Sequence, residues 1–208
     1  MTREEIITTA KPILFSTNMV SAILDGLKTQ TRRVIKPQPD NNGIIKAVTN
    51  AGEDSFFDVV NDRGLSDYRV GGILWVRETW GQNGHDGSLL YRADGDSPYI
   101  YPKWRPSIHM PKEAARIFLR VTGVRVKRLQ DISANDCVAE GIASPPDYKP
   151  EYTNMEIMPM TCNALIRDYA RLWNSTNEKH GYAWIDNPWV WVYEFERVTI
   201  DEQNSTYP

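Results

Sequence analysis

The stretch that decides the predicted fold is Ile23-Leu24-Asp25-Gly26-Leu27-Lys28-Thr29-Gln30-Thr31-Arg32-Arg33. Apolar residues recur at spacings of three and four up to this stretch, which predicts an amphipathic helix that begins at residues 16–18 and ends near Gly26. The composition of residues 31–35 predicts a strand directly afterwards. A short apolar run at residues 12–15 predicts another strand ahead of the helix, so the chain opens as strand, helix, strand.

The connection between helix and strand carries an amine, a hydroxyl and two guanidinium groups within six residues. Lys28 and Thr31 project from this tight turn, where a small anionic or polar ligand can sit, so we predict a candidate site here. The alternative is structural, because basic residues interact favourably with the C-terminal end of a helix and threonine is common in strands. These residues alone leave both interpretations open.

Length and charge bound the class of protein. The chain has 208 residues, enough for a sizeable core, and we predict a single domain over residues 1–208. It carries 24 Lys and Arg against 27 Asp and Glu, a net charge of −3. This balance argues against a protein coated in positive charge that grips duplex phosphates along its length. Any contact with nucleic acid is therefore expected to be local.

The sequence offers no recognisable metal motif, cofactor motif or membrane segment. Its cysteines and histidines are scattered without metal-ligand spacing: Cys137, Cys162, His85, His109 and His180. Neither common Gly-rich phosphate loop is present, and no run of about 18 apolar residues occurs. We therefore expect a cytoplasmic protein that uses no metal or cofactor and does not bind a membrane.

Several further elements are predicted along the chain. They are a hairpin over 44–48 and 56–60, strands over 71–80, 89–93, 116–129 and 189–198, and helices over 133–140 and 162–174. The long strand is expected to break at Gly123, where a bulge is one explanation. Short strands with few helices between them favour an α+β fold, a small mixed barrel with helical caps.

Four segments resemble, in order and spacing, the ASCH domain, a PUA-like small β-barrel. They are Gly26-Leu27-Lys28-Thr29-Gln30-Thr31-Arg32-Arg33, residues 71–76, residues 129–142 with Glu140-Gly141, and residues 191–195. The resemblance spans most of the chain and leaves insertions at about 37–70, 81–115 and 143–162. The longer form with the segments 74–80 and 104–111 is similar to phage and prophage proteins.

The resemblance also implies an activity. ASCH members include compact bacterial 4-acetylcytidine amidohydrolases, whose motif supplies a lysine, a threonine three residues later and a glutamate on the helix after the long strand. Lys28, Thr31 and Glu140 occupy these positions. Other members are thought to bind RNA, so the implied partner is a modified nucleoside or a single-stranded nucleic acid. This chain is much longer than the compact enzymes, and its substrate can differ accordingly.

Hydrolysis of an N-acyl cytosine needs a nucleophile, a base and a proton donor for the departing nitrogen. We expect Thr31 to attack and a neutral Lys28 to take its proton, because burial and the neighbouring Arg32 and Arg33 lower the pKa of a lysine. Glu140 would either activate a water or protonate the leaving nitrogen. All three are therefore candidate catalytic residues.

The alternative is a non-catalytic reader that stacks a base on aromatic rings, a contact worth about 1–3 kcal/mol per base. The candidate substrate or nucleic-acid contacts are Arg33, Arg77, Glu78, Trp80, Trp104, Arg105 and His109. Structural interpretations compete, because an Arg-Glu pair commonly binds cross-strand partners and a lone loop histidine is usually hydrogen-bonded. Trp75 and Trp80 are an odd number of positions apart, and side chains alternate between the faces of a strand. At most one of the two is therefore expected on a given face of a single strand.

Trp173, Trp189 and Trp191 are instead expected to lie in the core. A third hypothesis is that the chain is a phage accessory protein that binds a host protein through its insertions. A flat apolar patch over residues 40–70 would favour that reading.

Overall fold

The computed structural model describes residues 3–48, 54–61, 66–95, 102–143 and 159–199. The chain forms two compact units. Unit 1 comprises Met1–Gly26, Val70–Thr122 and Phe195–Pro208, and unit 2 comprises Leu27–Arg69 and Gly123–Glu194. The two longest strands, β8 (Phe118–Arg128) and β9 (Trp189–Arg197), contribute residues to both units.

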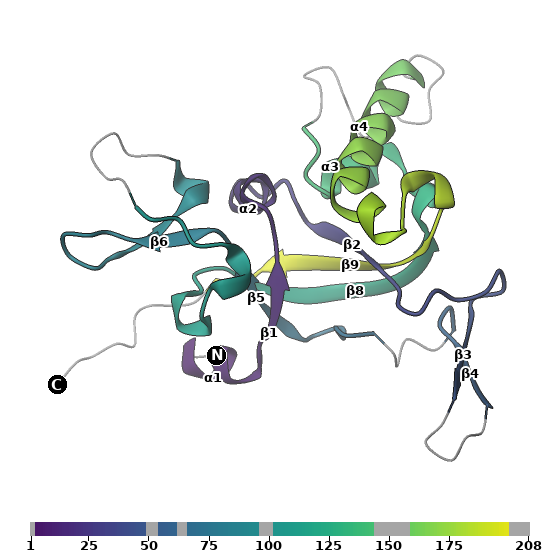
Figure 1. The fold of residues 1–208 in the computed structure, drawn as a ribbon, viewed down its shortest axis with the longest axis horizontal. Coiled ribbons are helices and arrows are strands. Elements are labelled where there is room, and N and C mark those ends of the chain that lie inside the picture. The colour runs from purple at the N-terminus through teal and green to yellow at the C-terminus, as the bar shows by residue number, and fades with distance from the viewer. Residues whose placement is uncertain (1–2, 49–53, 62–65, 96–101, 144–158, 200–208) are drawn as a thin grey trace. The chain divides into compact units, whose positions relative to one another are not determined.

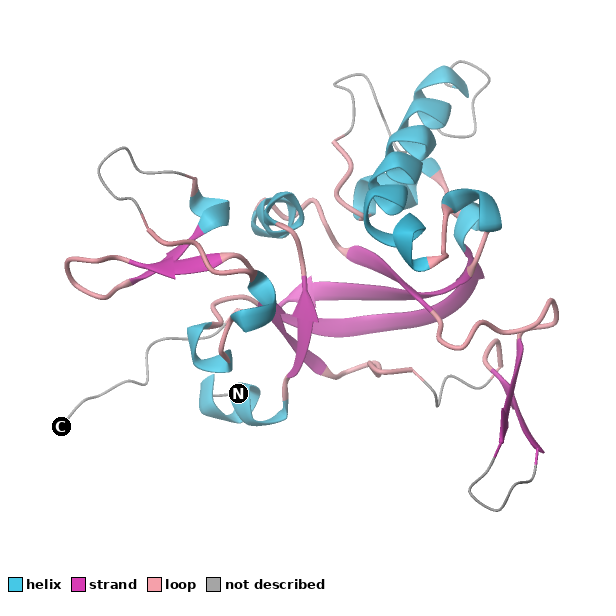
Figure 2. Cartoon of the chain, viewed as in Figure 1, coloured by secondary structure: helices cyan, strands magenta, loops and turns pink. Residues whose placement is uncertain are grey.

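Unit 1 combines short helices with parallel and antiparallel strands (Figure 2). Its elements are α1 (Arg3–Thr9), β1 (Lys11–Leu14), α2 (Thr17–Leu24), β5 (Ile73–Arg77), β6 (Trp80–Gln82) and β7 (Leu89–Tyr91). β1 runs parallel to β5, β5 pairs antiparallel with β8, and β6 and β7 form a separate hairpin. Ile6, Trp75 and Phe118 share one buried apolar cluster, so α1 packs with β5 and β8.

Unit 2 contains the strands and helices that carry the predicted site. Its elements are β2 (Gln30–Val34), β3 (Ile44–Val48), β4 (Asp54–Asp58), α3 (Ala134–Ala139) and α4 (Pro159–Asn177). β2 pairs antiparallel with β9, and β3 with β4. α3 and α4 lie side by side (Figure 1) and share a core with β9. Leu165, Tyr169 and Trp173 supply the buried stripe of α4 at a spacing of four residues.

The short helix α3 is fixed at both ends. At its start, the Ser133 side chain accepts a hydrogen bond from the Asp136 amide while the Asp136 carboxylate accepts one from the Ser133 amide, a capping box. At its end, Glu140 is the C-cap residue and Gly141 follows with φ of 92°. Glycine adopts this left-handed conformation without steric cost. The caps predicted at Ser133 and Gly141 are thus confirmed, and they fix the position of Glu140.

The α+β class is confirmed, and the opening strand, helix and strand lie within a few residues of their predicted positions. The hairpin at β3 and β4 is also present, although its second strand begins at Asp54 rather than residue 56. The sequence pattern did not indicate α1. Barrel closure and the single-domain organisation stay predictions, as does most of the insertion at 143–162, because residues 144–158 lie outside the described residues.

The prediction of one strand over residues 71–80 is wrong. β5 ends at Arg77, and Trp80 begins β6, which pairs with β7. The break falls at Glu78, whose buried carboxylate accepts hydrogen bonds of 2.9 and 3.0 Å from Arg116. Because the two residues lie on different strands, the alternation of side chains along one strand does not separate them. Trp75 and Trp80 lie in the same apolar cluster.

The break predicted at Gly123 is wrong as well, since β8 continues from Phe118 to Arg128. A Cβ atom on Gly123 would lie 2.2 Å from a carboxylate oxygen of Glu194. That carboxylate binds Arg125 Nη2 at 2.6 Å. The glycine therefore makes room for an ion pair rather than ending the strand.

Two of the three tryptophans assigned to the core, Trp173 and Trp191, are buried. Trp189 is only half-buried: its indole N–H donates to the Asp40 carbonyl at 2.8 Å, and Arg128 lies 4.3 Å from its ring centroid. The polar N–H edge of the indole explains why this ring lies at the edge of the core and is only half-buried. In the ranges that the structure describes, no helix is both long enough and apolar enough to span a bilayer.

We expect Leu165→Ala to lower the free energy of unfolding of the chain by about 2–5 kcal/mol, because it leaves a cavity in the α4 core. Ile185→Ala is the control, since Ile185 also lies in unit 2 but is 82% exposed, and it should change stability by less than about 0.5 kcal/mol. Urea unfolding followed by circular dichroism measures both. Equal losses in the two variants would contradict the assigned core.

Candidate functional site

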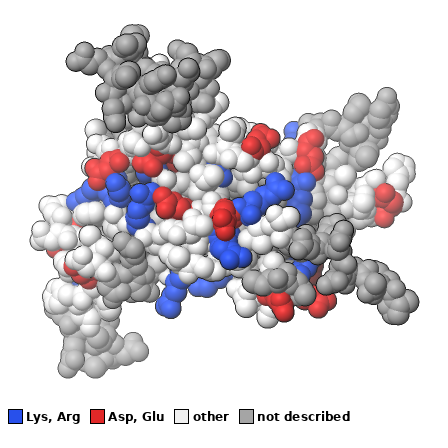
Figure 3. Space-filling model, turned by 180° about the vertical axis from the view of Figure 1, so that it is seen from behind, with Lys and Arg blue, Asp and Glu red and all other residues white. Residues whose placement is uncertain are grey.

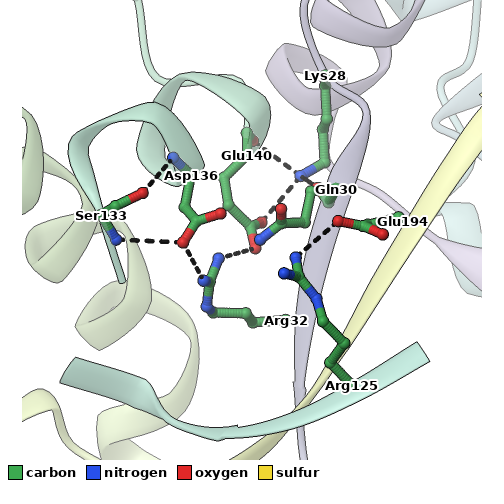
Figure 4. A network of polar contacts seen from close by, with 8 residues as sticks. All are labelled: Lys28, Gln30, Arg32, Arg125, Ser133, Asp136, Glu140 and Glu194. Carbon is green, nitrogen blue, oxygen red and sulfur yellow. Dashed lines mark hydrogen bonds and ion pairs between the residues drawn. The ribbon is translucent and has the colours of Figure 1, made fainter. Parts of the chain in front are cut away.

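Lys28 lies between α2 and β2 and is almost completely buried, with 2% of its surface exposed. Its ammonium nitrogen donates to the carbonyl of Gln30 at 2.7 Å and to the carbonyl of Glu140 at 2.8 Å. It also contacts the Glu140 Oε2 atom at 3.1 Å (Figure 4). The short connection predicted from the sequence therefore sends its amine inward, against the end of α3.

Glu140 holds its carboxylate between two cations. Oε2 faces Lys28, and Oε1 accepts a hydrogen bond of 3.0 Å from Arg32 Nη1. The Glu140 residue is 3% exposed. Burying a carboxylate without a partner is costly. Here a cation on each side neutralises the charge and offsets that cost.

Arg32 connects this carboxylate to the start of α3. Its Nη2 atom contacts Asp136 Oδ2 at 3.1 Å, and Asp136 belongs to the capping box with Ser133. The amide of Gln30 completes the network: with its nitrogen facing Asp136, the nitrogen donates to Oδ1 at 3.1 Å and the oxygen accepts from Arg32 at 2.7 Å. Figure 4 shows these side chains converging from β2 and α3.

The network balances two positive with two negative groups, Lys28 and Arg32 against Asp136 and Glu140. Removing one member of such a buried set leaves a charge without compensation and typically costs about 3–5 kcal/mol. The sequence motif indicated Lys28 and Glu140 but not the roles of Gln30, Arg32 and Asp136. The Ser133-x-x-Asp136 capping pattern was the available signal for Asp136.

Burial and neighbouring charges act in opposite directions on the titration of these groups. Burial lowers the pKa of Lys28, whereas the carboxylate of Glu140 opposes this effect, and the net direction is downward. For Asp136, burial would raise the pKa, but hydrogen bonds from Ser133 and the charge of Arg32 bring it below its ordinary value. The amine is thus closer to losing its proton than an exposed lysine would be.

Thr31 and Arg33 alternate with Gln30 and Arg32 along β2, so their side chains point to the other face of the strand. Thr31 is buried opposite Tyr193 of β9, and Arg33 is half-buried opposite Trp191. Burial lowers the pKa of Arg33, while Tyr68, Glu140 and nearby tyrosines oppose this.

Two tyrosines near Arg33 were missed by the sequence reasoning. The rings of Tyr68 and Tyr193 meet edge to face at 4.9 Å, and the Tyr193 hydroxyl lies 2.9 Å from the Ser66 hydroxyl. No spacing in the sequence connects these three residues, because they come from separate segments.

The other residues predicted to contact a ligand all lie in unit 1: Arg77, Glu78, Trp80, Trp104, Arg105 and His109. Glu78 binds Arg116, not the adjacent Arg77, and Arg77 instead donates to the Ile108 carbonyl. Trp80 is buried beneath the guanidinium of Arg105. The other two, Trp104 and His109, are half-buried and exposed, respectively.

Three apolar side chains are exposed on and just after the hairpin β3–β4, within residues 40–70, where a flat apolar patch would favour binding of a host protein. Phe56 is 66% exposed, and Phe57 and Val60 are also exposed. Phe56 and Phe57 are adjacent on one strand, so they point to opposite faces of the hairpin rather than to one flat patch. Binding of a host protein stays a prediction.

Within the described ranges, no group of three or more His, Cys, Asp or Glu residues could hold a metal ion. Cys137, the buried thiol nearest the network in sequence, has its pKa raised to about 12 by burial.

No family model matches the chain, and no curated protein matches it. Among solved structures, an ASCH domain from Lactobacillus crispatus JV V101 is similar at 11% identity and a TM-score of 0.45, covering 95% of this chain and 86% of that one. A DUF984 protein from Enterococcus faecalis V583 is similar at 10% identity and a TM-score of 0.40, covering 90% and 74%. The first of these is the domain that the sequence motifs resemble. A likeness of this degree carries no information on activity, so the chemistry depends on the residues of this chain.

We expect Asp136→Asn to lower the free energy of unfolding at pH 7 by about 1–3 kcal/mol, because it weakens both the cap and the contact with Arg32. The folded-state pKa of Asp136 lies below its ordinary value of 3.8. Protonation therefore favours unfolding, and the stabilisation should be complete above about pH 4 and shrink as the pH falls toward 2. Urea unfolding across this range measures it.

Asp168→Asn is the matched control, since its exposed pair with Arg171 should contribute less than about 1 kcal/mol. A difference between wild type and Asp136→Asn that stays constant from pH 7 to pH 2 would contradict the assigned role of this carboxylate.

Proposed function

We propose that unit 2 hydrolyses the N-acyl group of a modified pyrimidine nucleoside such as 4-acetylcytidine. The observation that carries the proposal is the buried contact of 3.1 Å between Lys28 Nζ and Glu140 Oε2. Titratable groups whose pKa is shifted by burial and by a specific charged partner are enriched at functional sites, because catalysis needs a pKa matched to proton transfer. The match of Lys28, Thr31 and Glu140 to the lysine, threonine and glutamate of the amidohydrolase motif supports the same assignment.

The contact provides a path for a proton. Transfer from the Lys28 ammonium to the Glu140 carboxylate converts an ion pair into a neutral amine and a neutral acid. Burial favours the neutral form of the amine, in line with the lowered pKa of Lys28. After transfer, Lys28 acts as a base and Glu140 as a proton donor, which are the two roles that amide hydrolysis requires.

Thr31 is the proposed nucleophile, as the hydroxyl three residues after Lys28. Thr31 points to the face of β2 away from Arg32, so this step requires the Thr31 side chain to turn toward the Lys28 amine. Its oxygen then attacks the acyl carbon while the Lys28 amine takes the hydroxyl proton. The bond between the acyl carbon and the exocyclic nitrogen then breaks, and Glu140 gives its proton to that nitrogen. These steps release cytidine and leave an ester on Thr31, with Lys28 and Glu140 again charged.

Hydrolysis of the ester repeats the cycle with water. Lys28 passes its proton to Glu140 and then removes a proton from the attacking water, while Glu140 returns its proton to the departing Thr31 oxygen. Arg32 is a positioning residue in this scheme, since its contact of 3.0 Å with Oε1 leaves Oε2 directed at Lys28. The products are the free carboxylic acid and the original enzyme.

The test is incubation of the protein with 4-acetylcytidine, both as a free nucleoside and within a short RNA, followed by chromatography of the product. We expect wild type to form cytidine, and we expect Lys28→Met, Glu140→Gln and Thr31→Val to lose about 10²- to 10⁴-fold in rate. The matched controls are Lys179→Met and Glu178→Gln, which alter exposed side chains of the same unit and should keep full activity.

Circular dichroism distinguishes lost chemistry from lost folding in the variants at buried charges. Thr31→Val keeps the shape of the side chain and introduces no unpaired charge, so it tests the nucleophile even where the other two fail to fold. A wild-type protein that is inert on both substrates would overturn the proposal. Binding of the acetylated RNA without hydrolysis would identify unit 2 as a reader instead.

A further inference from the structure

Tyr169 lies in the core of unit 2, and its hydroxyl has no hydrogen-bond partner among the residues that the structure describes. The residue belongs to α4 and is 3% exposed. Its ring centroid lies 6.4 Å from that of Trp173 and 6.3 Å from that of Trp184. This packing explains the position of the ring, but a buried tyrosine usually also places its hydroxyl against a partner. The hydroxyl therefore needs an explanation of its own.

The charged network of the candidate site lies beside this ring. The guanidinium carbon of Arg32 is 5.9 Å from the Tyr169 ring centroid, and the same guanidinium donates to Glu140 Oε1 at 3.0 Å. Tyr169 also shares a buried cluster with Cys137 of α3, the helix that ends at Glu140. The ring thus lies on the side of the network where Arg32 holds the Glu140 carboxylate.

The network has more donors than acceptors at this place. Each carboxylate oxygen of Glu140 and Asp136 already accepts a hydrogen bond within it. The Nε atom of Arg32 is a second donor that is buried and has no partner in the described part of the chain. The place therefore lacks an acceptor oxygen, which a bound molecule can supply.

Exposed polar groups of this protein are satisfied in other ways. Figure 3 shows acidic and basic side chains interspersed over one face, where water also reaches them. A buried donor has neither source of partners, and leaving it unpaired is unfavourable unless the site has a function in binding or catalysis. The two unpaired donors therefore indicate where a ligand completes the hydrogen bonding.

The Tyr169 hydroxyl keeps its proton near neutral pH. Burial raises the pKa of this hydroxyl well above its ordinary value, and the charge of Glu140 acts in the same direction, whereas Arg32 and Arg33 oppose it. The hydroxyl is thus a neutral donor, and the two arginines favour negative charge close to it. Donors of this kind stabilise an oxygen that becomes negative during acyl transfer.

We propose that the Tyr169 hydroxyl donates a hydrogen bond to the acyl oxygen of the substrate and stabilises it as an oxyanion. The inference rests on the hydrolysis proposed for unit 2. When the Thr31 oxygen bonds to the acyl carbon and Lys28 takes the hydroxyl proton, the electron pair of the C=O π bond moves onto the acyl oxygen. The pair returns when the carbon–nitrogen bond breaks and Glu140 gives its proton to the nitrogen. Tyr169 keeps its own proton throughout.

The same oxygen becomes negative a second time, when water attacks the ester on Thr31. A donor to the oxyanion therefore assists both the formation and the hydrolysis of the ester. A hydroxyl that only held the attacking water would assist the second step alone. The two roles thus differ in whether the ester accumulates once the hydroxyl is removed.

Tyr169→Phe tests the proposal, because it keeps the ring and removes only the hydroxyl. We expect kcat for the release of cytidine from 4-acetylcytidine at pH 7 to fall about 10²- to 10³-fold, with kcat/KM falling about equally. The hydroxyl has no hydrogen bond to lose in the described structure, so stability in urea should be unchanged or higher. A purely structural role predicts full activity.

Tyr182→Phe is the matched control. It removes the hydroxyl of a half-buried tyrosine of the same unit, whose ring centroid lies 5.3 Å from the Lys36 ammonium. Its activity should stay within about twofold of wild type. Mass spectrometry of protein quenched during turnover measures the fraction that carries the acyl ester, which in Tyr169→Phe should stay close to the wild-type fraction.

The outcomes separate this proposal from the hydrolysis itself. An active wild type with an equally active Tyr169→Phe overturns the oxyanion role and leaves the hydrolysis intact, whereas an inert wild type overturns both. A slow Tyr169→Phe that accumulates the ester assigns the hydroxyl to the attacking water and overturns the oxyanion role. A slow variant with lower stability than Tyr182→Phe identifies a structural hydroxyl and overturns it as well.

Discussion

The structure of unit 2 depends on one buried carboxylate, that of Glu140, held between the ammonium of Lys28 and the guanidinium of Arg32. Each of these groups would be expensive to remove from water alone, and together they are neutralised. The contact joins the start of β2 to the end of α3, across a sequence separation of 112 residues. The capping box at Ser133 and the glycine after Glu140 then fix where that carboxylate lies.

The two units use arginine in different ways. In unit 2, Arg32 is buried and gives its donors to two carboxylates, so it orients other charged groups. In unit 1, Arg116 binds the carboxylates, while Arg92 and Arg105 lie exposed over rings. A buried arginine that is paired with two carboxylates suits positioning within a reaction, whereas an exposed one that lies over a ring suits recognition of a planar ligand. The proposed hydrolysis draws on the first of these two arrangements.

The sequence predicted the α+β class and the approximate places of β2, α3, α4 and β9, because periodicity and capping residues are local signals. The approach of Glu140 to Lys28 is consistent with the motif resemblance, which named both residues. The break after Arg77 was not predictable from residues 71–80, since it depends on Glu78 meeting Arg116, a partner far along the chain. The same holds for Gly123. Its role is to leave room for the side chain of Glu194, which lies on another strand.

The most direct test of the account is a double-mutant cycle between Lys28→Met and Glu140→Leu, with the free energy of unfolding measured for both single variants and the double variant. Each single variant leaves a buried charge without its partner, whereas the double variant removes both charges. We predict that the double variant loses less stability than the sum of the singles by at least about 1.5 kcal/mol. Losses that add within about 0.5 kcal/mol would contradict the buried pair.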